Sequence, residues 1–162
     1  MANEGKRWER NFKKSIPGII RLYDTTSGYS GVKNPCDFVY YLYPFQYLFE
    51  CKSVEGTKLY FSAITENQHE QLDYYDHIYG VTSLIAVEFR EIKKCYLIPY
   101  KVIKRLNESG EKSIDYITAD KLEDVYEIPA VYKRTNCRIN LEDFQNLLGK
   151  VSKSLWESLK NI

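Results

Sequence analysis

The stretch DFVYYLYPFQYLFECK, from Asp37 to Lys52, decides the fold that we expect for this chain. Residues 37–42 and residues 47–52 are rich in aromatic, aliphatic and β-branched side chains, which favours a strand in each. Pro44 lies between them in a segment that we expect to turn, because proline lacks the N–H group that a central strand needs. The stretch is therefore predicted to fold into a β-hairpin.

Charged residues gather at the open end of this hairpin. Asp37 begins the first strand, while Glu50 and Lys52 lie near the end of the second. Because side chains alternate between the faces of a strand, Glu50 and Lys52 share one face and Cys51 points into the core. Burying unpaired charge is costly, so such a cluster needs a partner, and a divalent cation is a natural one.

The residue types suit metal-assisted hydrolysis of a phosphodiester. Asp37 and Glu50 offer the hard oxygen ligands that Mg²⁺ prefers, with Mn²⁺ as a substitute, and the backbone carbonyl of Cys51 could add a third. The ion would polarise a phosphate and acidify a water, while Lys52 could hold that water or stabilise charge on the phosphate. The alternative is structural: the same three charged side chains could form a salt-bridged strand edge.

The composition indicates one folded domain over residues 1–162, with 44% hydrophobic and 28% charged residues. The net charge of +1 does not by itself mark a nucleic-acid binder. The first 33 residues, however, hold seven basic side chains against three acidic ones. Basic residues beside a metal site could contact DNA phosphates, and the candidates from this segment are Arg7, Lys13, Lys14 and Lys33. The alternative is that they form ordinary solvated surface.

Four cysteines lie far apart in the sequence and form no C-x-x-C pair. This spacing indicates neither a zinc site nor a disulfide framework, so we expect free thiols in a reducing compartment, the cytoplasm. The N-terminus is polar, which is not typical of a signal peptide, and no apolar run approaches the ~20 residues that span a bilayer. We therefore expect no membrane association.

The rest of the chain alternates helix-like and strand-like patterns. Hydrophobic periodicity predicts further strands over residues 58–61, 81–89 and 94–99, and helices over residues 4–16, 62–79, 100–106, 140–148 and 151–159. Residues 24–35 are rich in Gly, Ser and Thr and are predicted to be a loop near the charged cluster, whereas residues 113–138 show no clear pattern. This order of elements indicates the α/β class, with a mixed β-sheet flanked by helices.

Several short motifs carry a resemblance to a known group of nucleases. Asp37 followed by Glu50-Cys51-Lys52 resembles the PD-(D/E)xK nuclease signature, with Pro35-Cys36-Asp37 as a displaced form of its proline-aspartate. The segment Gly5 to Glu9 is similar to the G-x-x-F/L-E that opens the RecU-type Holliday-junction resolvases, one branch of these nucleases. The run FSAITENQHEQL, Phe61 to Leu72, resembles the histidine- and glutamine-rich helix of the same branch.

This resemblance covers about residues 5–100 and implies a restriction-endonuclease-like core. The sequence pattern adds a helical extension over about residues 139–162, which the resemblance does not cover. The resemblance implies a homodimer that uses Mg²⁺ to make paired nicks in a four-way DNA junction, and a compact phage-encoded member acting in the host cytoplasm would fit. The roles that it implies are metal binding for Asp37 and Glu50, assistance to the attacking water for Lys52, completion of the acidic site for Glu9, and orientation of Lys52 or the metal-bound water for Gln68.

Two other functions stay open at this point. The same core is used by restriction and repair endonucleases, which act on linear DNA. A DNA-binding module could also keep the fold without cleaving, although two acids held so close have no evident purpose in such a protein.

Overall fold

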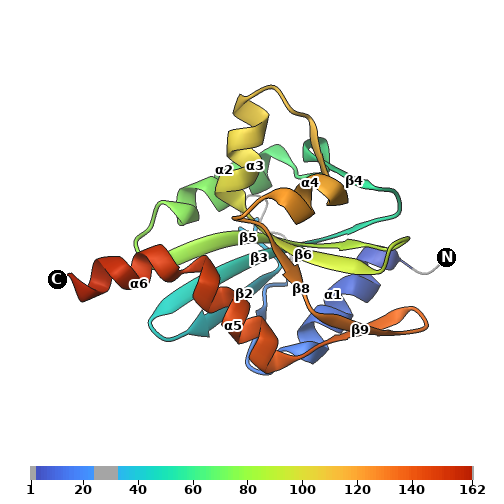
Figure 1. The fold of residues 1–162 in the computed structure, drawn as a ribbon, viewed down its shortest axis with the longest axis horizontal. Coiled ribbons are helices and arrows are strands. Elements are labelled where there is room, and N and C mark those ends of the chain that lie inside the picture. Colours follow the sequence, from blue (N-terminus) through green and yellow to red (C-terminus); the bar gives the residue numbers. More distant parts are fainter. Residues whose placement is uncertain (1–2, 24–32, 162) are drawn as a thin grey trace.

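The structure, a computed structural model, describes residues 3–23 and 33–161. Its centre is a six-stranded sheet with the strand order β1-β2-β3-β5-β6-β8 (Figure 1). These strands are β1 (Ile20–Arg21), β2 (Phe38–Leu42), β3 (Phe45–Val54), β5 (Val81–Phe89), β6 (Lys94–Pro99) and β8 (Tyr126–Ile128). Only the β3–β5 pair of this sheet is parallel, and the other neighbours run antiparallel. The predicted mixed sheet is therefore confirmed.

Helices cover both faces of the sheet (Figure 1). They are α1 (Glu4–Ser15), α2 (Glu66–Asp76), α3 (Tyr100–Glu108), α4 (Tyr116–Lys121), α5 (Leu141–Val151) and α6 (Lys153–Lys160). The helices α1 and α5 pack on one face through a buried cluster that includes Phe12 and Phe144. The helices α2, α3 and α4 pack on the other face through a second cluster that includes Leu72 and Val102. The α/β class with helices on both sides is confirmed, and none of the helices in the described ranges combines the length and the apolar character that crossing a bilayer requires.

The hairpin predicted from residues 37–52 is present, with a shorter turn and a longer second strand. β2 and β3 pair antiparallel from Phe38 opposite Phe49 to Leu42 opposite Phe45, so only Tyr43 and Pro44 connect them. β3 also pairs with β5 along its length as far as Val54. Because β3 has a hydrogen-bonded neighbour on each side, it extends two residues beyond the predicted end at Lys52.

The helix predicted over residues 62–79 is shorter in the structure. Residues 61–63 form a single 3₁₀ turn, and α2 begins only after Thr65, whose side chain accepts a hydrogen bond from the Gln68 backbone N–H. The Gln68 side chain in turn accepts from the Thr65 backbone N–H, which completes a capping box. Helix α2 ends at Asp76, and Gly80, at a φ of +82°, turns the chain into β5.

The segment 113–138, which has no clear sequence pattern, contains five short elements. Besides α4 and β8 these are β7 (Ser113–Asp115), β9 (Ala130–Lys133) and β10 (Asn136–Ile139). β7 pairs with β4 (Lys58–Tyr60), so the strand predicted at residues 58–61 forms a separate ladder rather than part of the central sheet. β9 and β10 pair only with each other. Most of the predicted loop 24–35 lies outside the described residues.

Candidate active site

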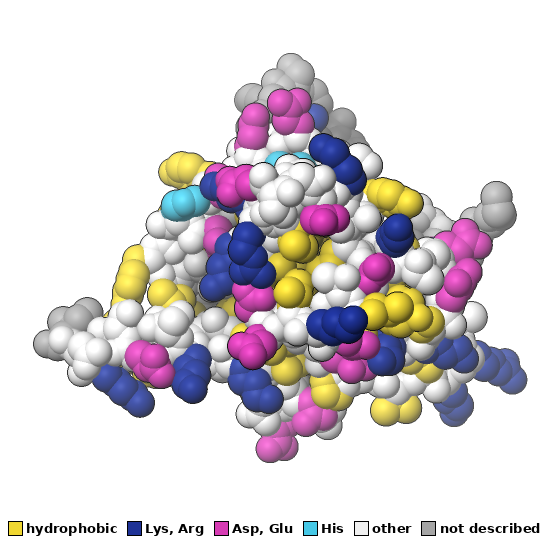
Figure 2. Space-filling view, turned by 45° about the horizontal axis from the view of Figure 1, so that its top comes forward, with side chains coloured by type: hydrophobic (Ala, Val, Ile, Leu, Met, Phe, Trp, Pro, Cys, Tyr) yellow, Lys and Arg dark blue, Asp and Glu magenta, His cyan; other side chains and the backbone are white. Residues whose placement is uncertain are grey.

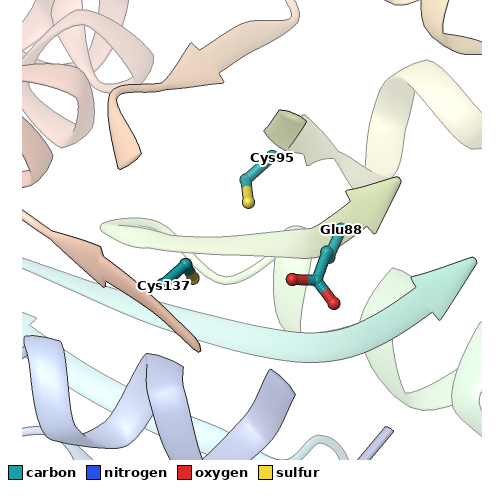
Figure 3. Close-up of side chains that lie close together, drawn as sticks. All are labelled: Glu88, Cys95 and Cys137. Carbon is teal, nitrogen blue, oxygen red and sulfur yellow. The ribbon is translucent and has the colours of Figure 1, made fainter. Parts of the chain in front are cut away.

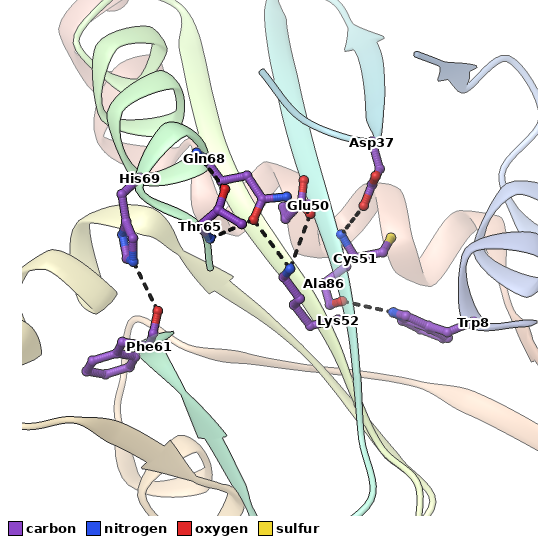
Figure 4. Close-up of polar contacts among 10 residues, drawn as sticks. All are labelled: Trp8, Asp37, Glu50, Cys51, Lys52, Phe61, Thr65, Gln68, His69 and Ala86. Atoms are coloured by element: carbon purple, nitrogen blue, oxygen red, sulfur yellow. Dashed lines mark hydrogen bonds and ion pairs between the residues drawn. The ribbon is translucent and has the colours of Figure 1, made fainter. Parts of the chain in front are cut away.

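The hairpin brings the two predicted carboxylates together. Asp37 lies just before β2, where its backbone N–H donates to the Phe49 carbonyl on β3 at 3.0 Å. Its side chain reaches across to the same strand, and Oδ2 accepts a hydrogen bond from the Cys51 backbone N–H at 2.9 Å (Figure 4). Glu50 is the residue before Cys51, is only 3% exposed, and is close enough to share a side-chain hydrogen bond with Asp37.

Gln68 joins this pair to the predicted lysine. Glu50 Oε1 accepts a hydrogen bond from Gln68 Nε2 at 2.7 Å and lies 3.6 Å from Lys52 Nζ. Lys52 Nζ also donates to Gln68 Oε1 at 3.4 Å (Figure 4). Because the same Gln68 oxygen accepts from the Thr65 backbone N–H, the capping box of α2 fixes the amide between the acid and the ammonium. The structure therefore brings four of the predicted site residues into one cluster: Asp37, Glu50, Lys52 and Gln68.

The pKa values of both carboxyl groups are raised, because nearby positive charge and hydrogen-bond donors only partly offset their burial. Burial and the neighbouring Asp37 raise the pKa of Glu50 to about 8, and Lys52 offsets this only in part. Burial also raises the pKa of Asp37, against the opposing effect of the Cys51 N–H donor. Two acids side by side with raised pKa values indicate a place where additional positive charge is needed.

A divalent cation fits this donor set. Carboxylate oxygens are the ligands that Mg²⁺ and Mn²⁺ prefer, and a cation between Asp37 and Glu50 would offset the burial and the neighbouring negative charge that raise their pKa values. The side chain of Cys51 points into the core cluster on the α1 face, as predicted. The Cys51 carbonyl as a third ligand stays a prediction.

Glu9 approaches the cluster from α1. The preceding residue, Trp8, is fully buried and donates from Nε1 to the Ala86 carbonyl on β5 at 2.9 Å, which anchors α1 against the sheet. The Glu9 carboxylate pairs with Arg21 at 2.7 Å, and its charge adds to burial in raising the pKa of Asp37. Glu9 therefore lies at the edge of the site, and its role as a further acid stays a prediction.

A basic cavity of about 440 Å³ opens beside Glu9. Three exposed side chains of α1, Lys6, Arg10 and Lys13, line it together with Arg21. Of these four basic residues, only Lys13 was predicted from the sequence to contact DNA phosphates. The i, i+4, i+7 spacing of Lys6, Arg10 and Lys13 on one helix face is the signal that could have identified the other two.

The remaining candidates for DNA contact lie elsewhere. Lys14 and Lys33 are exposed. Arg7 forms an ion pair with Glu4 and lines a different cavity. In Figure 2, Lys and Arg side chains are interspersed with Asp and Glu over the visible face, so that face presents no continuous basic surface. The cavity beside Glu9 is the basic region adjacent to the acidic cluster.

The family described as "RecU: Recombination protein U" matches residues 12–143. A solved structure of Hjc, a Holliday junction resolvase from the archaeal hyperthermophile Archaeoglobus fulgidus, is 23% identical, with a TM-score of 0.49 over 70% of this chain and 90% of that one. No curated protein matches the chain. Because the family match spans most of the sequence, this chain belongs to the RecU family, and the predicted resemblance to Holliday-junction-resolving nucleases is confirmed.

Proposed function

We propose that Asp37 and Glu50 of this Holliday-junction resolvase bind a divalent cation, Mg²⁺ or Mn²⁺, and that two copies of the chain make the paired cuts in a four-way junction. The observation that carries the metal proposal is the pair of buried, adjacent carboxylates whose pKa values are both raised. When bound, the cation would supply charge stabilisation for the scissile phosphate and a more acidic water.

The chain's own residues supply orientation and charge. Lys52 keeps one-fifth of its side chain exposed, so its ammonium can reach a phosphate at the surface while it stays near Glu50. There it would stabilise negative charge that grows on the phosphoryl oxygens during cleavage. Gln68 donates to Glu50 and accepts from Lys52, so it restricts both side chains to one arrangement before substrate binds.

The basic cavity beside Glu9 would hold the DNA backbone next to the acidic cluster. Lys6, Arg10 and Lys13 present their charges along one face of α1, and phosphate groups are the matching partner. The contacts predicted for Arg7, Lys14 and Lys33 would extend this interface. We propose the cytoplasm as the location, because the free cysteines fit a reducing compartment and the substrate is DNA.

A homodimer follows from the chemistry of the substrate. Resolution needs two cuts in opposing strands of a four-way junction, and the described residues contain one acidic cluster of this kind. A two-fold symmetric pair of chains would place one such cluster on each strand. The molar mass in solution, measured by analytical ultracentrifugation with and without junction DNA, tests this assembly.

Cleavage of a synthetic mobile four-way junction, compared with linear duplex of the same sequence, tests the site assignment. With Mg²⁺ we expect cleavage of the junction, and we expect Asp37→Asn or Lys52→Ala to reduce it by at least about a hundredfold while the chain stays folded. Glu123→Gln, which changes an exposed carboxyl group on the surface, is the control and should cleave like the parent. Full activity in both site variants would refute the assignment.

A further inference from the structure

A second cluster of potential metal ligands lies on the face of the sheet opposite Glu50. Glu88 on β5 pairs across the ladder with Cys95 on β6, and Tyr132 on β9 pairs with Cys137 on β10. These two cross-strand pairs face each other. The two sulfur atoms and a carboxylate oxygen all lie within 4.8 Å of one another (Figure 3).

The cluster is buried, and its carboxylate is held by hydrogen bonds from neutral groups. Glu88 is 1% exposed, and both cysteines are fully buried. The carboxylate accepts hydrogen bonds from two neutral groups, the Ser53 hydroxyl at 3.0 Å and the Tyr132 hydroxyl at 2.8 Å. In the described part of the chain, no Lys or Arg forms an ion pair with it. A buried carboxylate normally requires a cation or stronger donors.

The ligand types indicate which cation would suit the cluster. Two thiolates and a carboxylate form a mixed soft and hard set, for which Zn²⁺ is the common partner. Zn–S bonds of about 2.3 Å place two sulfurs of a tetrahedral site roughly 3.8 Å apart, so the two sulfur atoms would need to approach each other by about 1 Å at most. The three strands that carry these side chains, β5, β6 and β10, hold them near that arrangement before any ion binds.

We propose that Glu88, Cys95 and Cys137 form a structural zinc site that joins the β9–β10 hairpin to the central sheet. Tyr132, which hydrogen-bonds Glu88 and lies 3.2 Å from the Cys95 sulfur, is the positioning residue. A cavity of about 280 Å³ that is lined by Glu88 and Tyr132, together with basic side chains such as Arg90, lies beside the cluster and offers room for a water as fourth ligand. Binding releases the two thiol protons to solvent.

The proposed site gives the β9–β10 hairpin a link that its backbone does not provide. The two strands pair only with each other, so no ladder hydrogen bonds connect them to the six-stranded sheet. Cys95 lies in the central sheet and Cys137 in the hairpin, and a shared ion would tie one to the other.

Cobalt titration of the full-length chain tests this proposal. The Asp37→Asn background weakens ion binding at the acidic cluster, and only thiolate ligands give sulfur-to-cobalt absorption in the near ultraviolet. We expect that absorption to saturate at one Co²⁺ per chain, and Zn²⁺ to displace the cobalt. We expect Cys137→Ser to abolish it and Cys36→Ser to retain it, because Cys36 packs in the cluster on the other face.

A second variant, Glu88→Gln, tests the proposal even if Cys137→Ser fails to fold. Glu88→Gln keeps the size of the side chain, and we expect it to weaken zinc binding by at least about tenfold, since removing even an outer partner of a metal site has an effect of that size. Saturating Co²⁺ without thiolate absorption in the parent chain would overturn the proposal. A purified chain lighter by two hydrogens, with Cys95 and Cys137 unreactive to thiol reagents, would also overturn it and assign the pair to a disulfide.

Discussion

At the scale of single residues, Glu50 is a carboxyl group whose burial opposes folding when no cation is present. Its pKa rises from 4.5 to about 8 in the folded chain, so folding favours the protonated form. The resulting cost to stability is absent below pH 4.5, grows as the pH rises through this interval, and is complete above pH 8. The metal-free chain should therefore lose stability between these values on account of Glu50.

This cost predicts that Glu50→Gln stabilises the metal-free chain while abolishing cleavage. The gain in unfolding free energy should be small at pH 5 and reach at most about a few kcal/mol at pH 8, because one pKa unit corresponds to about 1.4 kcal/mol. Chemical denaturation at both pH values, without divalent cations, measures it. The surface variant Glu123→Gln should show no such pH dependence. An equal effect of Glu50→Gln at both pH values would mean that Glu50 is already ionised and compensated in the folded chain.

At the scale of elements, the N-terminus of α2 serves both the helix and the site. The Gln68 oxygen caps the helix through Thr65, and the Gln68 nitrogen holds Glu50. Thr65→Ala removes the other half of the capping box but leaves the Gln68 amide in place. Comparison of the two positions therefore separates helix stability from orientation of the site.

We expect Gln68→Ala and Thr65→Ala to reduce unfolding free energy by similar amounts, about 0.5–2 kcal/mol each. Junction cleavage, measured well below the melting temperature of each variant, should fall about a hundredfold in Gln68→Ala, because Glu50 and Lys52 lose a fixed neighbour. It should stay near the parent rate in Thr65→Ala. Equal loss of activity in both variants would mean that Gln68 acts only as a helix-capping residue.

The basic face of α1 leads to a prediction about DNA binding. If Lys6 and Arg10 contact phosphates, each alanine substitution should weaken junction binding and reduce the slope of log affinity against log salt by about one unit. Binding isotherms at several salt concentrations, with Ca²⁺ in place of Mg²⁺ to prevent cleavage, give the slopes. Lys121→Ala on α4, an exposed lysine on the other face of the sheet, is the control and should leave the slope unchanged. Unchanged slopes for Lys6→Ala and Arg10→Ala would place the DNA backbone elsewhere.

At the scale of the whole molecule, the sequence predicted what depends on local pattern. Runs of aromatic and β-branched residues around a proline identified the hairpin, and residue types within it identified Asp37, Glu50 and Lys52. The family resemblance identified Gln68, which lies beside them in the structure. Residues 113–138 escaped prediction because their strands are too short for a periodic pattern and depend on partners distant in sequence, such as β4 and β6. The same reason explains why cysteine spacing gave no sign of the Glu88, Cys95 and Cys137 cluster. Its members meet only because two separate hairpins face each other.

The proposed homodimer predicts a specific product from mixed assemblies. A dimer that contains one parent chain and one Asp37→Asn chain has a single competent site, so it should cut one strand of a junction and leave the opposing strand intact. On a cruciform plasmid, such a dimer should yield nicked circles, whereas the parent dimer yields linear molecules from paired cuts. Co-expression of the two chains with different affinity tags allows purification of the mixed dimer, and the parent dimer isolated with both tags is the control. If linear product only declines in proportion to the inactive chain, without accumulation of nicked circles, the two cuts do not come from two chains of one assembly.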